Sequence, residues 1–334
     1  MKAQQFKTAG VNARAAQRLA SVSIGVVSLL AMTLATPGFA ASALRVGISQ
    51  PAYSFVPLDV AIQSGTCKAA GVDVEKFIFS GSAQLHRAMT ADSVDIGLGA
   101  GPEFGFLVKG APEKAIAAMA DAPEDLALVV LKDGPIKDLA ELRGKRVSMS
   151  TKGSLTEWAA NTLSLQQGWG RDGMSMLPLG SFSAQTAALK THQIDAMVVE
   201  AGTAGHMEEE GSGRTLVRFG KVVPHFHIHV TYATDKIIAS NPDSVKRFMT
   251  CWFDGLAYMK THRAESVKIA SEVLDMSADL SGKLYDLLMP HYNLTGKFDP
   301  QAMQVIAQSI MDMGQSDAKP DLTKYYDESF LPTK

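Results

Sequence analysis

Residues 71–101, GVDVEKFIFSGSAQLHRAMTADSVDIGLGAG, contain the pattern that decides the fold. A run rich in β-branched and aromatic residues at 72–79 stops at Ser80-Gly81-Ser82, a helical pattern follows at 83–92, and a second apolar run begins at Val94. A strand, a helix and a strand in this order predict two parallel strands joined by a right-handed crossover. At the turn, we expect Ser82 to be the helix N-cap and Gly81 to give the backbone the freedom to turn.

The same alternation extends in both directions from this stretch. It begins with LRVGIS at 44–49, restarts with RVSMS at 146–150 after a turn, and gives way to helices after a strand-like run at 225–238. We expect the later helices at about 241–262, 264–275, 277–290 and 299–313. This order predicts an α/β protein of two lobes with parallel-core sheets and flanking helices. We place lobe I at 44–132, lobe II at 133–228, and a return to lobe I with C-terminal helices at 229–334.

The N-terminal segment is expected to be a signal peptide at residues 1–40. Four basic residues and no acid precede an apolar run at 19–35, and small residues follow Pro37. These features predict export to the periplasm and cleavage near residues 40–43, with an uncleaved membrane anchor as the alternative. The remainder carries a formal net charge of −6, which gives no reason to expect binding to nucleic acid.

The chain has two cysteines, Cys67 and Cys251. An oxidising compartment would allow them to pair. Cys251, however, lies in the apolar helical stretch FMTCWFDGLAYM, which favours a small buried hydrophobic residue. We therefore expect no disulfide, while the pairing stays open as the alternative.

Loops that follow the carboxyl ends of strands are the expected place for a ligand in open parallel sheets. Six such loops precede helices, at 49–55, 80–83, 99–103, 150–154, 180–185 and 200–205, and four of them (80–83, 150–154, 180–185 and 200–205) contain Gly with Ser or Thr. Three belong to each lobe, so the pattern predicts two half-sites that face a common cleft.

Five segments together resemble a known family. They are LRVG at 44–47, the stretch at 71–101, DLAELRGKRVSMSTKGS at 138–154, AALKTHQIDAMVVE at 187–200 and NPDSVKRFM at 241–249. In this order and spacing they resemble the solute-binding proteins of nitrate/sulfonate/taurine ABC importers, a class that includes thiamine-precursor binders.

The resemblance covers residues 44–314 and implies a type II-like periplasmic binding protein, monomeric, with hinge segments near 126–132 and 227–233. The implied partners are a small-molecule ligand and an ABC permease. The same fold in a sensory or other transporter system is the alternative, and a pyrimidine-synthesis enzyme is a more remote one.

The family's ligand loops fall on eight candidate binding residues: Tyr53, Ser80, Gly81, Ser82, Gly101, Lys152, Ser154 and Glu200. Backbone amides at a helix start suit an anion such as a sulfonate or carboxylate. Tyr53 is a stacking group, Lys152 could pair with an anion or point to solvent, and Glu200 could hold an amino group. Glu103 is more simply an acid at a helix N-terminus.

Metal and enzyme sites are not expected. His225, His227 and His229 alternate, so they should share one face of a strand, but no cysteine or acid near them in sequence completes a metal site. Nucleophile elbows, Walker loops and metalloprotease helices are missing from the sequence. Pyrimidine-forming relatives with a cysteine-rich iron site do not fit a chain with two scattered cysteines. We expect no catalytic residue and no cofactor.

Overall fold

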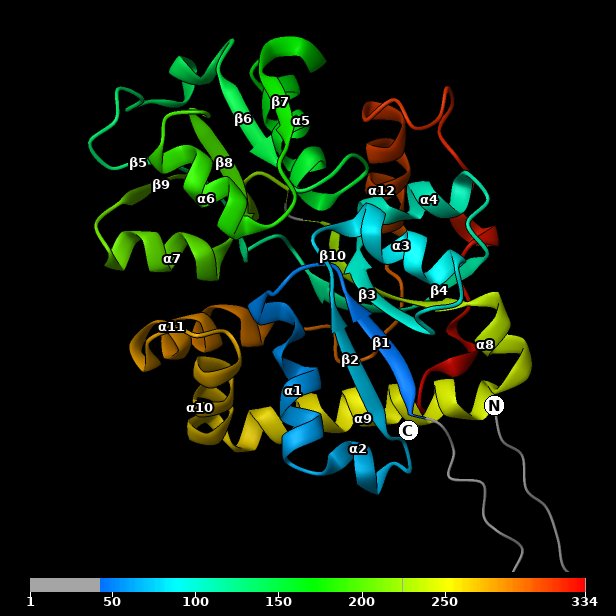
Figure 1. Cartoon of the computed structure of the whole chain (residues 1–334). Helices are drawn as coiled ribbons and strands as arrows, with labels where there is room; N and C mark the ends of the chain where they lie inside the picture. Colours follow the sequence, from blue (N-terminus) through cyan, green and yellow to red (C-terminus); the bar gives the residue numbers. More distant parts are fainter. Residues whose placement is uncertain (1–42, 224, 334) are drawn as a thin grey trace, which may run out of the picture. The chain divides into compact units, whose positions relative to one another are not determined.

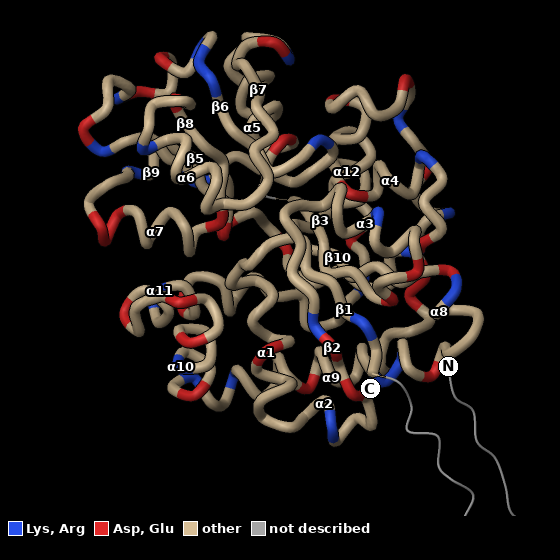
Figure 2. The backbone as a smooth tube through the Cα atoms, in the orientation of Figure 1, with Lys and Arg blue, Asp and Glu red and all other residues tan. Residues whose placement is uncertain are grey.

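The computed structural model describes residues 43–223 and 225–333. The expected signal peptide lies outside the described residues. The remainder, Ser42–Lys334, is one compact unit and contains two five-stranded sheets (Figure 1). None of the described helices combines the length and the apolar character needed to cross a bilayer. Acidic and basic residues are interspersed over both sheets and their helices (Figure 2).

The first sheet has the strand order β2-β1-β3-β10-β4. Its strands are β1 (Leu44–Ile48), β2 (Val74–Ile78), β3 (Ile96–Ala100), β4 (Glu113–Asp121) and β10 (His227–Thr234). β1, β2 and β3 are parallel, which confirms the expected core, whereas β10 is antiparallel to both β3 and β4. The first residues of β10 therefore lie at the carboxyl end of β3, with His229 opposite Ala100.

The second sheet repeats this plan with the order β7-β6-β8-β5-β9. Its strands are β5 (Leu126–Leu131), β6 (Arg146–Met149), β7 (Ser175–Pro178), β8 (Ala196–Glu200) and β9 (Gly213–Arg218). β6, β7 and β8 are parallel, and β5 is antiparallel to β8 and β9. Leu126 pairs with Glu200, so the start of β5 lies beside the end of β8.

The chain passes between the two sheets in two segments, residues 122–125 and 219–226. The segments near 126–132 and 227–233, which were expected to be hinges, are instead strands inside the sheets. The boundary between the lobes was expected at residue 132 but lies before β5, because β5 belongs to the second sheet. The apolar pattern LALVVL predicts a buried strand but does not say which sheet receives it. Below, lobe II means residues 126–218, and lobe I the other described residues outside the crossing segments.

The helix after Ser80-Gly81-Ser82 and the four C-terminal helices match their expected positions closely, whereas the end of the run at 225–238, expected to be strand, is helical from Asp235. The first eight helices are α1 (Val56–Gln63), α2 (Thr66–Ala69), α3 (Ser82–Thr90), α4 (Phe104–Val108), α5 (Leu155–Gln166), α6 (Phe182–Lys190), α7 (Ala201–Glu209) and α8 (Asp235–Ser240). The four C-terminal ones are α9 (Pro242–Thr261), α10 (Arg263–Val273), α11 (Ala278–Leu288) and α12 (Pro300–Asp312). Short 3-10 turns η1 (Tyr53–Phe55) and η2 (Gly101–Glu103) open two of the loops.

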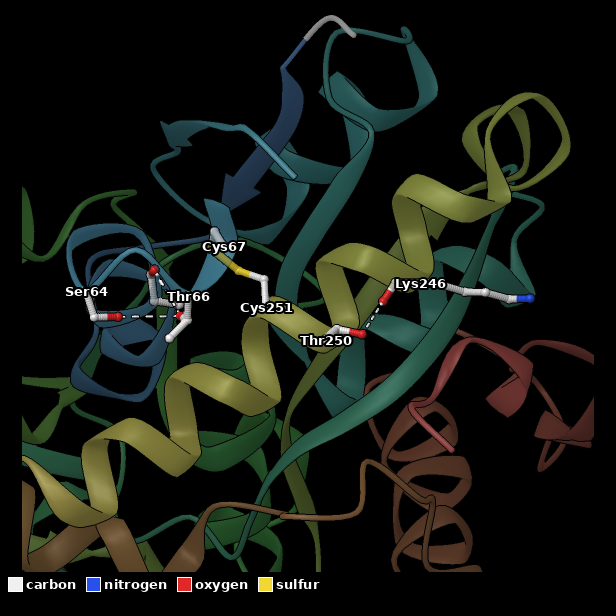
Figure 3. The surroundings of a disulfide bond; sticks show 7 residues. Ser64, Thr66, Cys67, Lys246, Thr250 and Cys251 are labelled. Carbon is white, nitrogen blue, oxygen red and sulfur yellow. Dashed lines mark hydrogen bonds between the residues drawn. A yellow bond between two sulfur atoms is a disulfide. The ribbon is translucent and has the colours of Figure 1, made fainter. Parts of the chain in front are cut away.

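Helix α9 packs on lobe I, to which β10 has already returned the chain. Asn241 caps its start by accepting from the amide of Ser244, and apolar residues spaced three and four apart bury one face against α1 and α2. On that face Cys251 forms a disulfide with Cys67 of α2, 184 residues earlier (Figure 3). The expectation of no disulfide is therefore wrong. Cys251 is buried as predicted, but only the packing of α9 on α2 shows that its neighbour is a cysteine.

Candidate functional site

The main candidate site is a pocket of about 550 Å³ whose wall comes from both lobes and from the C-terminal helices. Lobe I contributes the loop after β1, lobe II contributes the starts of α6 and α7, and the segment between α10 and α11 closes one side. The wall includes Tyr53, Phe182, Glu200 and Met276. The pocket thus joins two of the eight predicted residues, Tyr53 and Glu200.

The pocket lies where strand ends and helix starts meet. η1 follows β1, α6 follows β7 and α7 follows β8, so each loop leaves the carboxyl end of a parallel strand. At α6, the hydroxyl of Ser181 accepts a hydrogen bond from the amide of Ala184 at 3.3 Å. The amides of the first helical turn have no partner four residues earlier within the helix and can serve an anion.

The rim of the pocket carries charges that pair with one another. Lys190 contacts Glu210 at 2.7 Å, and His206 contacts the same carboxylate at 3.1 Å. All three side chains are exposed. Such pairs contribute little to stability, which leaves them available to a ligand.

Tyr53 forms part of the pocket wall and is held in place from both ends. Its hydroxyl lies 3.4 Å from the hydroxyl of Ser281, and its carbonyl accepts from the hydroxyl of Tyr292 at 3.0 Å. Burial raises the pKa of Tyr53 to about 12. The side chain is therefore a neutral, rigid ring, which suits packing against the body of a ligand.

Glu200 belongs to a buried cluster with Asp125 and His229. His229 Nε2 lies 2.9 Å from Asp125 Oδ2, which also accepts from the hydroxyl of Ser54. Among the residues that the structure describes, Asp125 Oδ1 and Glu200 Oε2 have no hydrogen-bond partner. Burial and the charge of Asp125 raise the pKa of Glu200 well above its usual value. His229 lowers the pKa of Asp125, although burial acts in the opposite direction.

The loop at Ser80–Ser82 lies outside this pocket wall and contacts lobe II directly. The amide of Ala83 donates to the hydroxyl of Thr151 at 3.3 Å. Gly81 has φ +115° and ψ 161°, and a β-carbon there would lie 2.7 Å from the Thr151 methyl group. Ser80 is likewise beside lobe II, since its carbonyl lies 3.8 Å from the β-carbon position of Gly180.

Ser82 is not the helix cap that the sequence predicts. Gly81 occupies the N-cap position of α3, without a side chain to cap it, and Ser82 is the first helical residue. The Ser82 hydroxyl instead donates to Glu103 Oε1 at 2.5 Å. The reason is a buried carboxylate, contributed by η2, that competes with the helix amides for this hydroxyl.

The same carboxylate belongs to a second buried cluster around His86. His86 Nε2 lies 2.8 Å from Glu103, and Nδ1 lies 2.8 Å from Glu113. Ionised carboxylates only accept hydrogen bonds, so both ring nitrogens donate. Burial alone would lower the pKa of His86, but the charges and hydrogen bonds of Glu113 and Glu103 outweigh it and raise the pKa to about 9. Glu103 therefore fixes the start of α3 rather than capping its own helix.

The other predicted residues have identifiable structural surroundings. Gly101 has no room for a side chain, because a β-carbon would lie 2.4 Å from the carbonyl oxygen of His227. Ser154 is the N-cap of α5 and accepts from the amide of Glu157 at 3.3 Å. Lys152 is exposed in the loop before α5. These three residues lie outside the wall of the described pocket, and their contact with a ligand stays a prediction.

The histidines on and before β10 do not share one environment. A register shift lies between His227 and His229, so the expected common face is interrupted. His227 contacts Asp121 and accepts from the amide of Asp299, whereas His229 packs edge-on against Phe55. The acid that contacts His229 is Asp125, which is 104 residues earlier in the sequence.

The chain belongs to the family described as NMT1/THI5 like, whose sequence model matches residues 52–266, more than half of the chain. The alkanesulfonate-binding protein SsuA of Xanthomonas axonopodis pv. citri, solved with MOPS bound, is similar with a TM-score of 0.70 and 19% identity over 83% of this chain and 94% of that chain. The Candida albicans CA3427 gene product, described as having the generic periplasmic binding protein fold, has a TM-score of 0.75 and 19% identity over 87% and 98%. The fold is that of the periplasmic binding proteins, as the sequence predicts.

An enzyme also has this fold. The desulfurization enzyme DSZB matches with a TM-score of 0.60 and 15% identity over 86% of this chain and 97% of its own. No curated protein matches the chain in sequence.

The sequence pattern indicates His229 as a possible ligand but not the acids that complete its cluster, and it predicts neither Asp125 nor the segment 274–276. Asp125 precedes a strand and His229 lies near the start of one, whereas the predicted ligand loops follow strand ends. Residues 274–276, which join α10 to α11, enter the pocket wall from the helical block. An acid directly before a fully apolar strand, as in PEDLALVV at 123–130, was the available signal for Asp125.

Proposed function

We propose that the protein captures a small organic solute between its lobes in the periplasm and delivers it to an ABC permease. The observation that carries this proposal is the 550 Å³ pocket, because its wall is assembled from both lobes. A solute that contacts both walls stabilises the closed arrangement over any open one. The volume suits a small molecule.

The chemistry of the wall supports an anionic headgroup on a partly apolar body, as in an organic sulfonate or carboxylate. The first-turn amides of α6 and α7 supply donors for the headgroup. Tyr53, Phe182 and Met276 supply the apolar surface. Because its raised pKa favours the protonated form, Glu200 can donate a hydrogen bond instead of repelling the anion.

The proposed compartment and oligomeric state follow from separate observations. Disulfides such as the one between Cys67 and Cys251 form and persist in oxidising compartments, which agrees with the expected signal peptide. The pocket is formed within one chain, so a monomer suffices for binding.

Binding without catalysis agrees with the contacts of Ser54. Its hydroxyl donates to Asp125, which separates it from His229. A serine nucleophile requires its hydroxyl to reach a base that is itself oriented by a third group. Here the acid, not the histidine, holds the hydroxyl.

The test is a thermal-shift panel on refolded, solute-free protein. It should contain alkanesulfonates, aminosulfonates, carboxylates, nitrate and, as the opposite class, organic amines without an acid group. A true solute at 100 times its Kd should stabilise the protein by about 2.7 kcal/mol. The Phe182→Ala variant should bind at least tenfold more weakly by calorimetry, whereas Phe253→Ala, outside the wall of this pocket, should bind like the wild type. Stabilisation by amines alone, or equal binding by the two variants, would overturn the proposed solute class or site.

A further inference from the structure

The cluster of Asp125, Glu200 and His229 has the donor set of a metal site. One oxygen or nitrogen atom from each residue lies within 4.8 Å of the others, and all three residues are buried. They are 2%, 6% and 2% exposed. They come from three separate parts of the chain: a crossing segment, the end of β8 in lobe II and β10 in lobe I.

The ring of His229 is oriented as a ligating imidazole. Its Nδ1 lies 3.2 Å from the carbonyl oxygen of Gly99. A carbonyl oxygen can only accept, so Nδ1 carries the hydrogen and Nε2 points at the acids. Metal-binding histidines characteristically donate their other ring N–H to a carbonyl or carboxylate, which fixes the tautomer and the ring.

The two carboxylates have free oxygens inside the cluster. Asp125 Oδ1 and Glu200 Oε2 are buried and have no hydrogen-bond partner among the described residues. A buried polar atom without a partner is costly and calls for a donor, a water or a cation. The raised pKa of Glu200 favours its protonated form in the metal-free protein. A metal ion that displaces this proton meets two carboxylates and one neutral imidazole, whose total charge of −2 a divalent cation neutralises.

The distances are compatible with shared coordination. His229 Nε2 lies 2.9 Å from Asp125 Oδ2. Two donors of one metal, each at roughly 2.0–2.2 Å from the ion, stand about 3 Å apart at an octahedral angle and about 3.4 Å apart at a tetrahedral angle, so Zn²⁺ requires this pair to open slightly. Glu200 also lines the solute pocket, so a ligand position toward the pocket can be filled by water or by an oxygen of the solute.

We propose that Asp125, Glu200 and His229 bind a divalent transition-metal ion, Zn²⁺ or Mn²⁺, behind the part of the pocket wall that Glu200 forms. An imidazole favours Zn²⁺ over Mg²⁺ and Ca²⁺, which prefer oxygen ligands alone, whereas the two carboxylates of the set also suit Mn²⁺. Because Glu200 belongs to lobe II and His229 to lobe I, the ion ties the two lobes together beside the crossing segments.

The test uses the metal alone as probe. Protein stripped with chelator is titrated calorimetrically with Zn²⁺, Mn²⁺ and Mg²⁺, and Co²⁺ serves as a spectroscopic substitute. We expect one Zn²⁺ or Mn²⁺ per chain, at least tenfold tighter than Mg²⁺, and a visible Co²⁺ absorption band. His229→Gln and Glu200→Gln should each weaken binding by at least tenfold and abolish the Co²⁺ band.

Two variants serve as controls. His227→Gln removes a buried histidine from the same strand, and His206→Gln removes the exposed histidine of the pocket rim; both should bind metal like the wild type. Circular dichroism and thermal melts check the fold of each variant, and two independent ligand substitutions protect against one misfolded protein. Failure of Zn²⁺ and Mn²⁺ to bind the wild type would overturn the proposal. So would unchanged binding by folded His229→Gln, or loss of binding in His206→Gln.

The metal site and the solute proposal fail separately. The titration contains no solute, so a negative result leaves solute capture standing. A protein that binds metal at His229 but no compound of the panel keeps the metal site and loses the proposed solute class.

Discussion

Replacing Gly81 with alanine tests whether the contact between the Ser80–Ser82 loop and lobe II belongs to the solute-bound arrangement. The new β-carbon meets two separate obstacles. The backbone at φ +115° and ψ 161° is a conformation that only glycine adopts readily, at a cost of about 1–3 kcal/mol for other residues. The β-carbon would also lie 2.7 Å from the methyl group of Thr151 in lobe II.

The two costs can be separated with a second substitution. Thr151→Ser removes the methyl group and keeps the hydroxyl that accepts from the amide of Ala83. The next atoms near the new β-carbon would then be the Thr151 hydroxyl position at 3.2 Å and Ser150 at 3.5 Å. The backbone cost remains in the double variant, whereas the clash between lobes disappears.

We expect Gly81→Ala to lower the free energy of unfolding by about 1–3 kcal/mol and to weaken solute binding at least tenfold, about 1.4 kcal/mol. Gly81→Ala/Thr151→Ser should recover most of the binding and little of the stability, and Thr151→Ser alone should bind like the wild type. Urea unfolding measures stability, and calorimetry with the solute found in the panel measures binding. Wild-type affinity in Gly81→Ala, or no recovery in the double variant, would show that this contact plays no part in solute binding.

Two further predictions concern stability. Reduction of the disulfide between Cys67 and Cys251 should lower the free energy of unfolding by about 5 kcal/mol, because the bond closes a loop with a sequence separation of 184 residues. Identical urea midpoints for oxidised and reduced protein would contradict it. Burial lowers the pKa of His86, but Glu113 and Glu103 outweigh this effect and raise the pKa to about 9. Protonation of His86 should therefore stabilise the folded protein by on the order of 3 kcal/mol, and this stabilisation is complete below the unfolded pKa of about 6.5. This contribution should disappear as pH rises through about 9. His86→Gln should lack the decline, and a wild-type pH profile in that variant would refute the assignment.

The pattern of apolar residues predicted most of the fold because the amphipathic helices bury one face and the central strands are apolar along almost their whole length. The four C-terminal helices lie within a few residues of their expected bounds, because apolar residues spaced three and four apart form one face of a helix and do not fit a strand. Assignment of β5 to a sheet was not predictable. LALVVL is buried on both faces, and a strand of this kind reads the same in either sheet.

Half of the candidate site was predictable for a similar reason. Tyr53 and Glu200 follow parallel strands, whose carboxyl ends share one edge of a sheet. Asp125 and His229 reach the same edges because β5 and β10 run antiparallel, so that their first residues lie beside the ends of β8 and β3. The direction of a strand depends on which strands it pairs with, and the local sequence pattern does not indicate this. The positions of Asp125 and His229 could therefore not be predicted.

The place of β10 between β3 and β4 has a consequence for the order in which the protein assembles as its chain emerges from the N-terminus. All five strands of the second sheet come from residues 126–218, so this sheet is complete as soon as that segment is available. The first sheet has to wait, because β4 joins it only through β10. The disulfide can form only later, when Cys251 is available to Cys67. We therefore expect lobe II to fold first. Lobe I, although it contains the first strands of the chain, should fold only after β10 and the C-terminal helices are available.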